Sequence, residues 1–106
     1  MHPEMDATER GIVLTILEDA LQAGYKVTVC DGAENAIENS TSKEAIFAAM
    51  FSTGADTLFF DDQDGQQVGW IFLVYGNREC VVSDCTDNMA MESLLKNADA
   101  LAERYS

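Results

Sequence analysis

The stretch "FFDDQDGQQVGWIFLVY", residues 59–75, decides the fold of this chain. It places two apolar runs on either side of a polar segment that contains Asp64 and Gly65. An Asp-Gly pair between apolar runs is typical of a two-residue β-hairpin turn. The stretch therefore predicts two antiparallel strands joined by a tight turn.

The side chains around this turn predict a register for the hairpin. A turn at residues 64 and 65 places Phe60 opposite Gly69 and Phe59 opposite Trp70. An aromatic side chain can cover the bare backbone of a strand glycine, and aromatic cross-strand pairs are favourable. The residue types on the two strands therefore agree with the turn.

The same register divides the predicted sheet into two faces, because successive side chains of a strand point to opposite sides. Both faces are apolar along residues 67–75, which is typical of a central strand with both faces covered. One face holds Leu58, Phe60, Ile71, Leu73, Tyr75 and Val82, and the other holds Phe59, Val68, Trp70, Phe72, Val74 and Val81.

Apolar residues that recur every three or four positions predict three helices outside this stretch. Each helix follows a polar residue suited to an N-cap, and two have a glutamate three residues later, as in a capping box. The expected helices are 7–23 with Asp6 and Glu9 at its start, 41–54 with Thr41 and Glu44 at its start, and a last helix capped by Thr86 or Asp87.

The remaining strands follow from alternation of apolar and polar residues. Strands are expected at 26–30, 56–61, 67–75 and 79–84, with a weaker strand at 33–40. The fold class is therefore α+β: a single antiparallel sheet of four to five strands with three helices, in the order α-β-(β)-α-β-β-β-α. Residues 1–106 form one domain, in which 1–5 are expected to be a loose N-terminal end.

The two apolar faces lead to a hypothesis about an interface. If the helices cover one face only, Phe59, Trp70, Phe72 and Val74 are left open. An apolar patch of that size is rarely exposed on a monomer. These four residues are the candidate interface, either for another protein or for a second copy in a homodimer.

The charge of the chain limits its partners. Nineteen carboxylates against six basic side chains give a formal net charge of −13. Such a surface repels nucleic acid and anionic membranes, and it favours a basic protein partner. Two further interpretations stay open: the charge can serve solubility alone, or the carboxylates can mimic the phosphates of a nucleic acid.

The sequence offers no catalytic constellation. The one histidine, His2, lies in the expected loose end, and Cys30, Cys80 and Cys85 lack the spacing of a zinc site. A signal peptide begins with a basic segment followed by an apolar run, and the first residues of this sequence do not have that pattern. We therefore expect a cytoplasmic protein without cofactor or metal, in which the cysteines are small buried hydrophobic residues.

The aspartates near the turn form a candidate acidic patch of Asp61, Asp62 and Asp64. A calcium loop of the EF-hand type is excluded, because two of its ligand positions would be Phe60 and Ile71. Weak binding of a divalent ion and a purely structural role in the turn both remain open.

Farther along, the segment "SDCTDN", residues 83–88, is interpreted as a helix cap, with Asp84, Thr86, Asp87 and Asn88 all able to take part.

Two segments carry a resemblance to known sequences. "ERGIVLTILEDALQAGYKVTV", residues 9–29, and "VGWIFLVYGNRECVVSDCTDN", residues 68–88, resemble small acidic proteins of proteobacterial phages, plasmids and integrated elements. The likeness lies in the helix leading into a strand, the tryptophan strand and the "YGN…SD" hairpin. It implies an accessory protein of a mobile element, and it brings no reaction or site residues.

Three functions are compatible with these observations. The first is a non-enzymatic interaction module, an accessory or inhibitor protein acting on a basic partner. The second is a structural domain that associates only with itself. The third is a small enzyme that uses carboxylates, which would require some of Asp61, Asp62, Asp84 and Cys80 to meet in one pocket.

Overall fold

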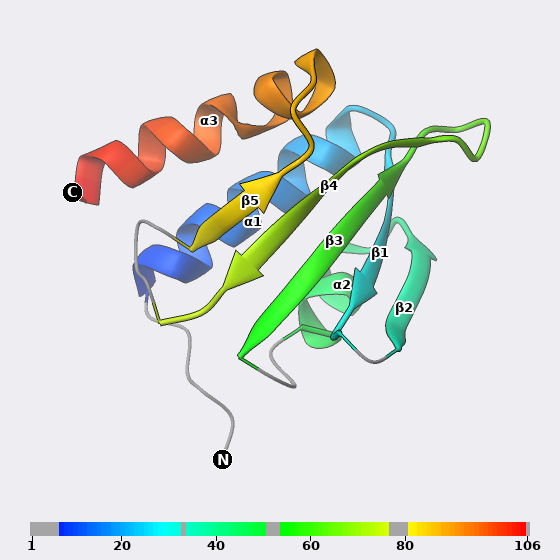
Figure 1. Cartoon of the computed structure of the whole chain (residues 1–106), viewed down its shortest axis with the longest axis horizontal. Helices are drawn as coiled ribbons and strands as arrows, with labels where there is room; N and C mark the ends of the chain where they lie inside the picture. The colour runs from blue at the N-terminus through cyan, green and yellow to red at the C-terminus, as the bar shows by residue number, and fades with distance from the viewer. Residues whose placement is uncertain (1–6, 33, 51–53, 77–80, 106) are drawn as a thin grey trace.

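The computed structural model describes residues 7–32, 34–50, 54–76 and 81–105 (Figure 1). A single antiparallel sheet has the strand order β2-β1-β3-β4-β5. The predicted α+β class and element order are confirmed, including the weaker strand β2. The elements are α1 (Ala7–Gln22), β1 (Lys26–Cys30), β2 (Asn35–Ser40), α2 (Lys43–Ala48), β3 (Ala55–Asp61), β4 (Gln67–Val74), β5 (Val82–Cys85) and α3 (Met89–Tyr105).

The helices pack on one face of the sheet. In Figure 1 the sheet lies in front of α1 and α2, and α3 runs along the side of β5. Side chains alternate along β1, β3 and β4, so every second residue points into the core between the sheet and the helices. The strand members of that core are Val27, Val29, Leu58, Phe60, Ile71 and Leu73, all fully buried, and its helix members include Ile16, Leu17, Ile46, Met91 and Leu95.

The predicted pairing of β3 and β4 is correct, but the predicted turn is wrong. Phe60 pairs with Gly69 and Phe59 with Trp70, as expected. The loop is longer than two residues, because the N–H of Asp62 donates to the carbonyl of Gln66 at 2.8 Å. Asp61 pairs with Gln67, and a bulge on β4 restores the register beyond it.

Bulges also move two residues away from the face that holds Phe59 and Trp70, where the alternation had placed them. Val68 lies at the β4 bulge and packs against the core. Val81 is fully buried, and its carbonyl accepts the N–H of Val74 at 2.9 Å. A second irregularity, in the pairing of β4 with β5, breaks the simple alternation on which the prediction depended.

Two predicted helix caps lie one or two residues away from their observed positions. Ser42, and not Thr41, caps α2, since its Oγ accepts the N–H of Ala45 at 3.3 Å. Asn88, and not Thr86 or Asp87, caps α3, since its Oδ1 accepts the N–H of Met91 at 2.9 Å. Each of these side chains satisfies a backbone donor that has no partner within the helix.

Some predictions fall on residues outside the described part. They are the loose end at 1–5, the cap at Asp6, the placement of Cys80 and the start of the strand at 79–84. α2 ends at Ala48, well before the predicted Gly54. None of the described helices is long and apolar enough to span a membrane.

Candidate functional site

The candidate site is the sheet face opposite the helices, here called the open face. The helices cover the other face, which is the alternative in which Phe59, Trp70, Phe72 and Val74 are left open. Each of the four candidate interface residues is partly exposed. The open face carries Lys26, Thr28 and Cys30 of β1, Thr57, Phe59 and Asp61 of β3, Trp70, Phe72 and Val74 of β4, and Asp84 of β5.

Strand pairing brings three aromatic side chains of the open face together. Phe59 and Trp70 are paired across β3 and β4, and Phe72 is paired with Thr57 on the same two strands. The next strand adds Asp84, which is paired with Phe72. Three neighbouring strands therefore bring these five side chains into one cluster.

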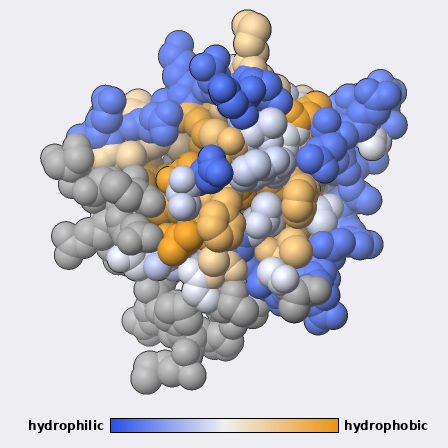
Figure 2. Space-filling model, in the orientation of Figure 1, coloured by the Kyte–Doolittle hydropathy of each residue, from blue (hydrophilic) through white to orange (hydrophobic). Residues whose placement is uncertain are grey.

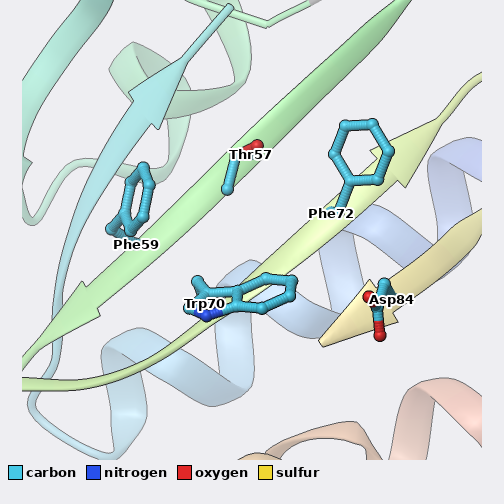
Figure 3. Close-up of a pocket in the computed structure, with 5 residues that line it drawn as sticks. All are labelled: Thr57, Phe59, Trp70, Phe72 and Asp84. Carbon is cyan, nitrogen blue, oxygen red and sulfur yellow. The ribbon is translucent and has the colours of Figure 1, made fainter. Parts of the chain in front are cut away.

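A hollow of about 330 Å³ lies among these five residues. Figure 3 shows Thr57 between Phe59 and Phe72, with the indole of Trp70 alongside and Asp84 on the side away from Phe59. The walls are mainly aromatic, and the carboxylate at one end is the charged group of the lining. We call this cavity the aromatic hollow.

Hydrogen bonds between backbone N–H groups and both side-chain and backbone oxygens hold Trp70 and Asp84 in place. The N–H of Trp70 donates to Oγ1 of Thr86 at 2.9 Å, and the N–H of Thr86 donates to the carbonyl of Trp70 at 3.0 Å. This reciprocal pair fastens the end of β5 to the middle of β4. The N–H of Cys85 donates to Oδ1 of Asp84 at 2.9 Å, which orients the exposed carboxylate at the rim.

The open face has an apolar centre and a charged margin. Figure 2 shows hydrophobic and intermediate side chains in the middle of this view, with a hydrophilic side chain among them and hydrophilic side chains along the upper and right-hand margins. At one end Lys26 is paired with Asp61, an opposite-charge pair of the kind that favours strand pairing. This division between centre and margin resembles that of protein interfaces, in which a less charged core is surrounded by a polar rim.

The three aspartates of the candidate acidic patch have different roles in the structure. Asp61 lies on the open face at the end of β3. Asp62 organises the loop, because its Oδ1 accepts the N–H of Asp64 at 2.9 Å and that of Gln66 at 3.0 Å. Asp64 is exposed at the tip, and Gly65 beside it has a φ of 83°, which suits glycine.

The carboxylates considered for an enzyme do not converge. Asp61 is paired with Gln67, and Asp84 is paired with Phe72, five residues farther along β4. Asp61 lies four residues beyond Thr57, the β3 partner of Phe72, so at about 3.4 Å per residue the backbone positions of the two aspartates are about 14 Å apart along the strand direction. Cys80 lies outside the described residues.

Two buried carboxylates were missed by sequence reasoning. Glu9 and Asp56 are each 1% exposed. Oε2 of Glu9 accepts the N–H of Gly76 at 2.7 Å, and Oδ2 of Asp56 accepts the hydroxyl of Tyr75. Strand alternation with Leu58 could have placed Asp56 on the core face. The spacing of Glu9 with Val13 could have placed it on the buried side of α1.

The phenol of Tyr75 stays protonated in this environment. Burial, followed by the hydrogen bond to Asp56 and the charges of Asp56 and Glu9, raises the pKa of Tyr75 far above its ordinary value of 10.0. The group therefore acts as a hydrogen-bond donor that holds a buried carboxylate. This arrangement joins α1, β3 and the end of β4, on the face opposite the open face.

The two described cysteines, Cys30 and Cys85, are free thiols and partly buried. Burial, followed by the negative charges of Asp84, Asp87 and Asp99, raises the pKa of Cys85. A raised pKa disfavours the reactive thiolate. Cys85 also packs against the core, which matches its predicted role as a small hydrophobic residue.

Within residues 7–32, 34–50, 54–76 and 81–105, no group of three or more histidine, cysteine, aspartate or glutamate side chains is placed to hold a metal ion. Comparison with protein-family models, with curated proteins and with solved structures finds no match for this chain.

Proposed function

We propose that this protein is a non-enzymatic interaction module that binds another protein through the open face. The observation that carries the proposal is the row formed by Phe59, Trp70 and Phe72 on the face without helices. Large aromatic side chains dominate binding energy at protein interfaces. On a monomer this face would leave them in contact with water.

The charge of the chain favours a basic partner. The formal net charge of −13 repels a second copy of the same chain and attracts a protein with a basic surface. Asp61 and Asp84 place negative charge at the margin of the apolar centre. Electrostatic complementarity of this kind speeds encounter and selects among partners.

A mobile-element role is part of the same proposal. The resemblance to accessory proteins of phages and plasmids supports a module that acts on a host protein, and a basic nucleic-acid-handling protein fits the charge. Carboxylates that mimic phosphates are a more specific form of this role. The alternative is a homodimer through the open face, which the apolar row supports equally and the charge opposes.

An affinity experiment tests the proposal. Tagged wild-type protein and the double variant Phe59→Ser, Trp70→Ser are used to capture partners from host lysate, and the captured proteins are identified by mass spectrometry. Met89→Ser is the matched control, because Met89 is 84% exposed on α3 and lies outside the open face. We expect wild type and the control to retain a basic partner that the double variant loses.

Two outcomes oppose the proposal. Equal capture by the double variant would show that the open face is not the binding surface. A dimeric mass by light scattering at micromolar concentration, returning to monomer in the double variant, would favour the homodimer instead. Circular dichroism of each variant verifies that the fold is retained.

A further inference from the structure

We infer that the aromatic hollow receives an arginine side chain of the partner, with the guanidinium on the carboxylate of Asp84. This inference rests on the proposed function and specifies the chemistry that the open face recognises. Its basis is the combination of aromatic walls and one carboxylate in a single cavity. Neither feature alone would select a cation of this shape.

The size of the hollow fits one side chain. Its volume is about 330 Å³, and it is open along the sheet surface. It opens on the sheet surface between strands β3, β4 and β5 (Figure 3). A long side chain that projects from a partner surface can therefore enter it without rearrangement of the strands.

The electrostatics of the hollow favour a cation. The faces of aromatic rings carry negative potential and attract ammonium and guanidinium groups, most strongly at tryptophan. Asp84 adds a full negative charge at the end of the same cavity. The described basic residue on this face, Lys26, is paired with Asp61 at the other end of the sheet and does not line the hollow.

Arginine fits these walls better than lysine does. Its guanidinium is planar, weakly hydrated and able to stack on aromatic rings, while an ammonium group is compact and strongly hydrated. It can also donate two parallel hydrogen bonds to one carboxylate. Oδ1 of Asp84 already accepts the N–H of Cys85, which keeps the carboxylate at the rim in a defined orientation.

The chain contains one tryptophan, Trp70, and it lines the hollow, so its fluorescence reports directly on occupancy. The probe is the blocked tripeptide acetyl-Gly-Arg-Gly-amide, titrated into the full chain to millimolar concentration. Three matched peptides carry citrulline, lysine or trimethyllysine in place of arginine. Citrulline has nearly the same shape as arginine but no charge.

We expect saturable binding of the arginine peptide and at least about fivefold weaker binding of the citrulline and lysine peptides. Asp84→Asn should weaken binding of the arginine peptide by a similar factor. Asparagine can still accept the N–H of Cys85, but it carries no charge. Asp64→Asn, with the same charge change at the exposed hairpin tip, should leave binding within about twofold.

Any of three results would overturn the inference. The citrulline peptide could bind as tightly as the arginine peptide, Asp84→Asn and Asp64→Asn could have equal effects on binding, or none of the peptides could bind. Tighter binding of trimethyllysine would assign the hollow to a methylated lysine instead. Failure here is distinguishable from failure of the proposed function. If Phe59→Ser, Trp70→Ser loses the captured partner while Asp84→Asn keeps it, the open face binds the partner without an arginine in the hollow.

Discussion

The side chain of Met91 on α3 lies directly against the bare backbone of Gly69 on β4. A Cβ atom added at Gly69 would lie 2.6 Å from Cγ and 2.8 Å from Sδ of Met91. On the same face, Phe60 is paired with Gly69. The glycine therefore admits both an aromatic neighbour in the sheet and a close approach of the helix.

Gly69→Ala should destabilise the protein, because the new methyl group would overlap Met91 in a fully packed core. Overpacking of this kind costs about 1–3 kcal/mol of the free energy of unfolding, measured here by urea denaturation. The double variant Gly69→Ala, Met91→Ala should be less destabilised than the sum of the two single variants. Strict additivity would show that the two residues do not compete for the same space.

Adjacent residues of β4 should differ sharply in their contribution to stability. Leu73 is fully buried against the helices, while Phe72 is partly exposed on the open face. Leu73→Ala should lower the free energy of unfolding by about 2–5 kcal/mol, and Phe72→Ala by only about 1 kcal/mol. Comparable losses in urea denaturation would indicate that the open face is covered within the monomer.

Tyr75→Phe should destabilise the protein at neutral pH, because the buried carboxylate of Asp56 loses its hydroxyl donor. Loss of a hydrogen bond to a charged group costs about 1.5–3 kcal/mol. Thermal denaturation at pH 7 measures the loss. An unchanged melting temperature would contradict a stabilising role for this contact.

The same tyrosine predicts a dependence of stability on alkaline pH. Its folded pKa is raised above the ordinary value of 10.0, chiefly by burial. Its stabilising contribution is therefore fully present below pH 10. Above that pH it is lost progressively, since the unfolded chain releases a proton that the folded chain retains.

Relative to Tyr75→Phe, the wild-type free energy of unfolding should therefore fall by up to about 1.4 kcal/mol per pH unit above pH 10. Parallel urea denaturation of both proteins between pH 8 and pH 11 provides the comparison. The substitution leaves Tyr25 and Tyr105 in place, so their ionisation is common to both proteins. Parallel curves would show that Tyr75 ionises normally in the folded state.

Asn88→Ala should destabilise α3. Oδ1 of Asn88 caps the helix at the N–H of Met91, and its Nδ2 donates to the carbonyl of Val68 at 2.9 Å. Loss of an N-cap costs about 0.5–2 kcal/mol, and loss of the second contact adds to it. Asp87→Ala, at the neighbouring exposed position, is the control and should have little effect in thermal denaturation.

Local patterns in the sequence determined most of the fold. Alternation placed Leu58, Phe60, Ile71 and Leu73 on one face and Phe59, Trp70, Phe72 and Val74 on the other, as observed. The pairing of Phe60 with Gly69 was predictable because an aromatic residue and a glycine complement each other across two strands. The formal net charge of −13 also follows from composition alone, and the proposal of a basic partner rests on it.

The predictions failed where hydrogen bonds with distant segments or irregular strands decided the outcome. The carboxylate of Glu9 accepts the N–H of Gly76, 67 positions along the chain, and no local pattern predicts this contact. Val68 and Val81 left their predicted face because bulges in β4 and β5 break the two-residue period. In both cases the deciding contact or bulge depends on a second segment of the chain, which a local sequence pattern does not include.

Apart from Val68 and Val81 at the bulges, the sequence by itself determined which residues share a face of the sheet, because the period of a strand is a local property of its backbone. Only the tertiary structure decided which face the helices cover. Both faces of β4 are apolar, so burial of either would satisfy the hydrophobic effect. The choice depends on the packing of α1, α2 and α3 against the sheet, and it leaves Phe59, Trp70 and Phe72 around the aromatic hollow.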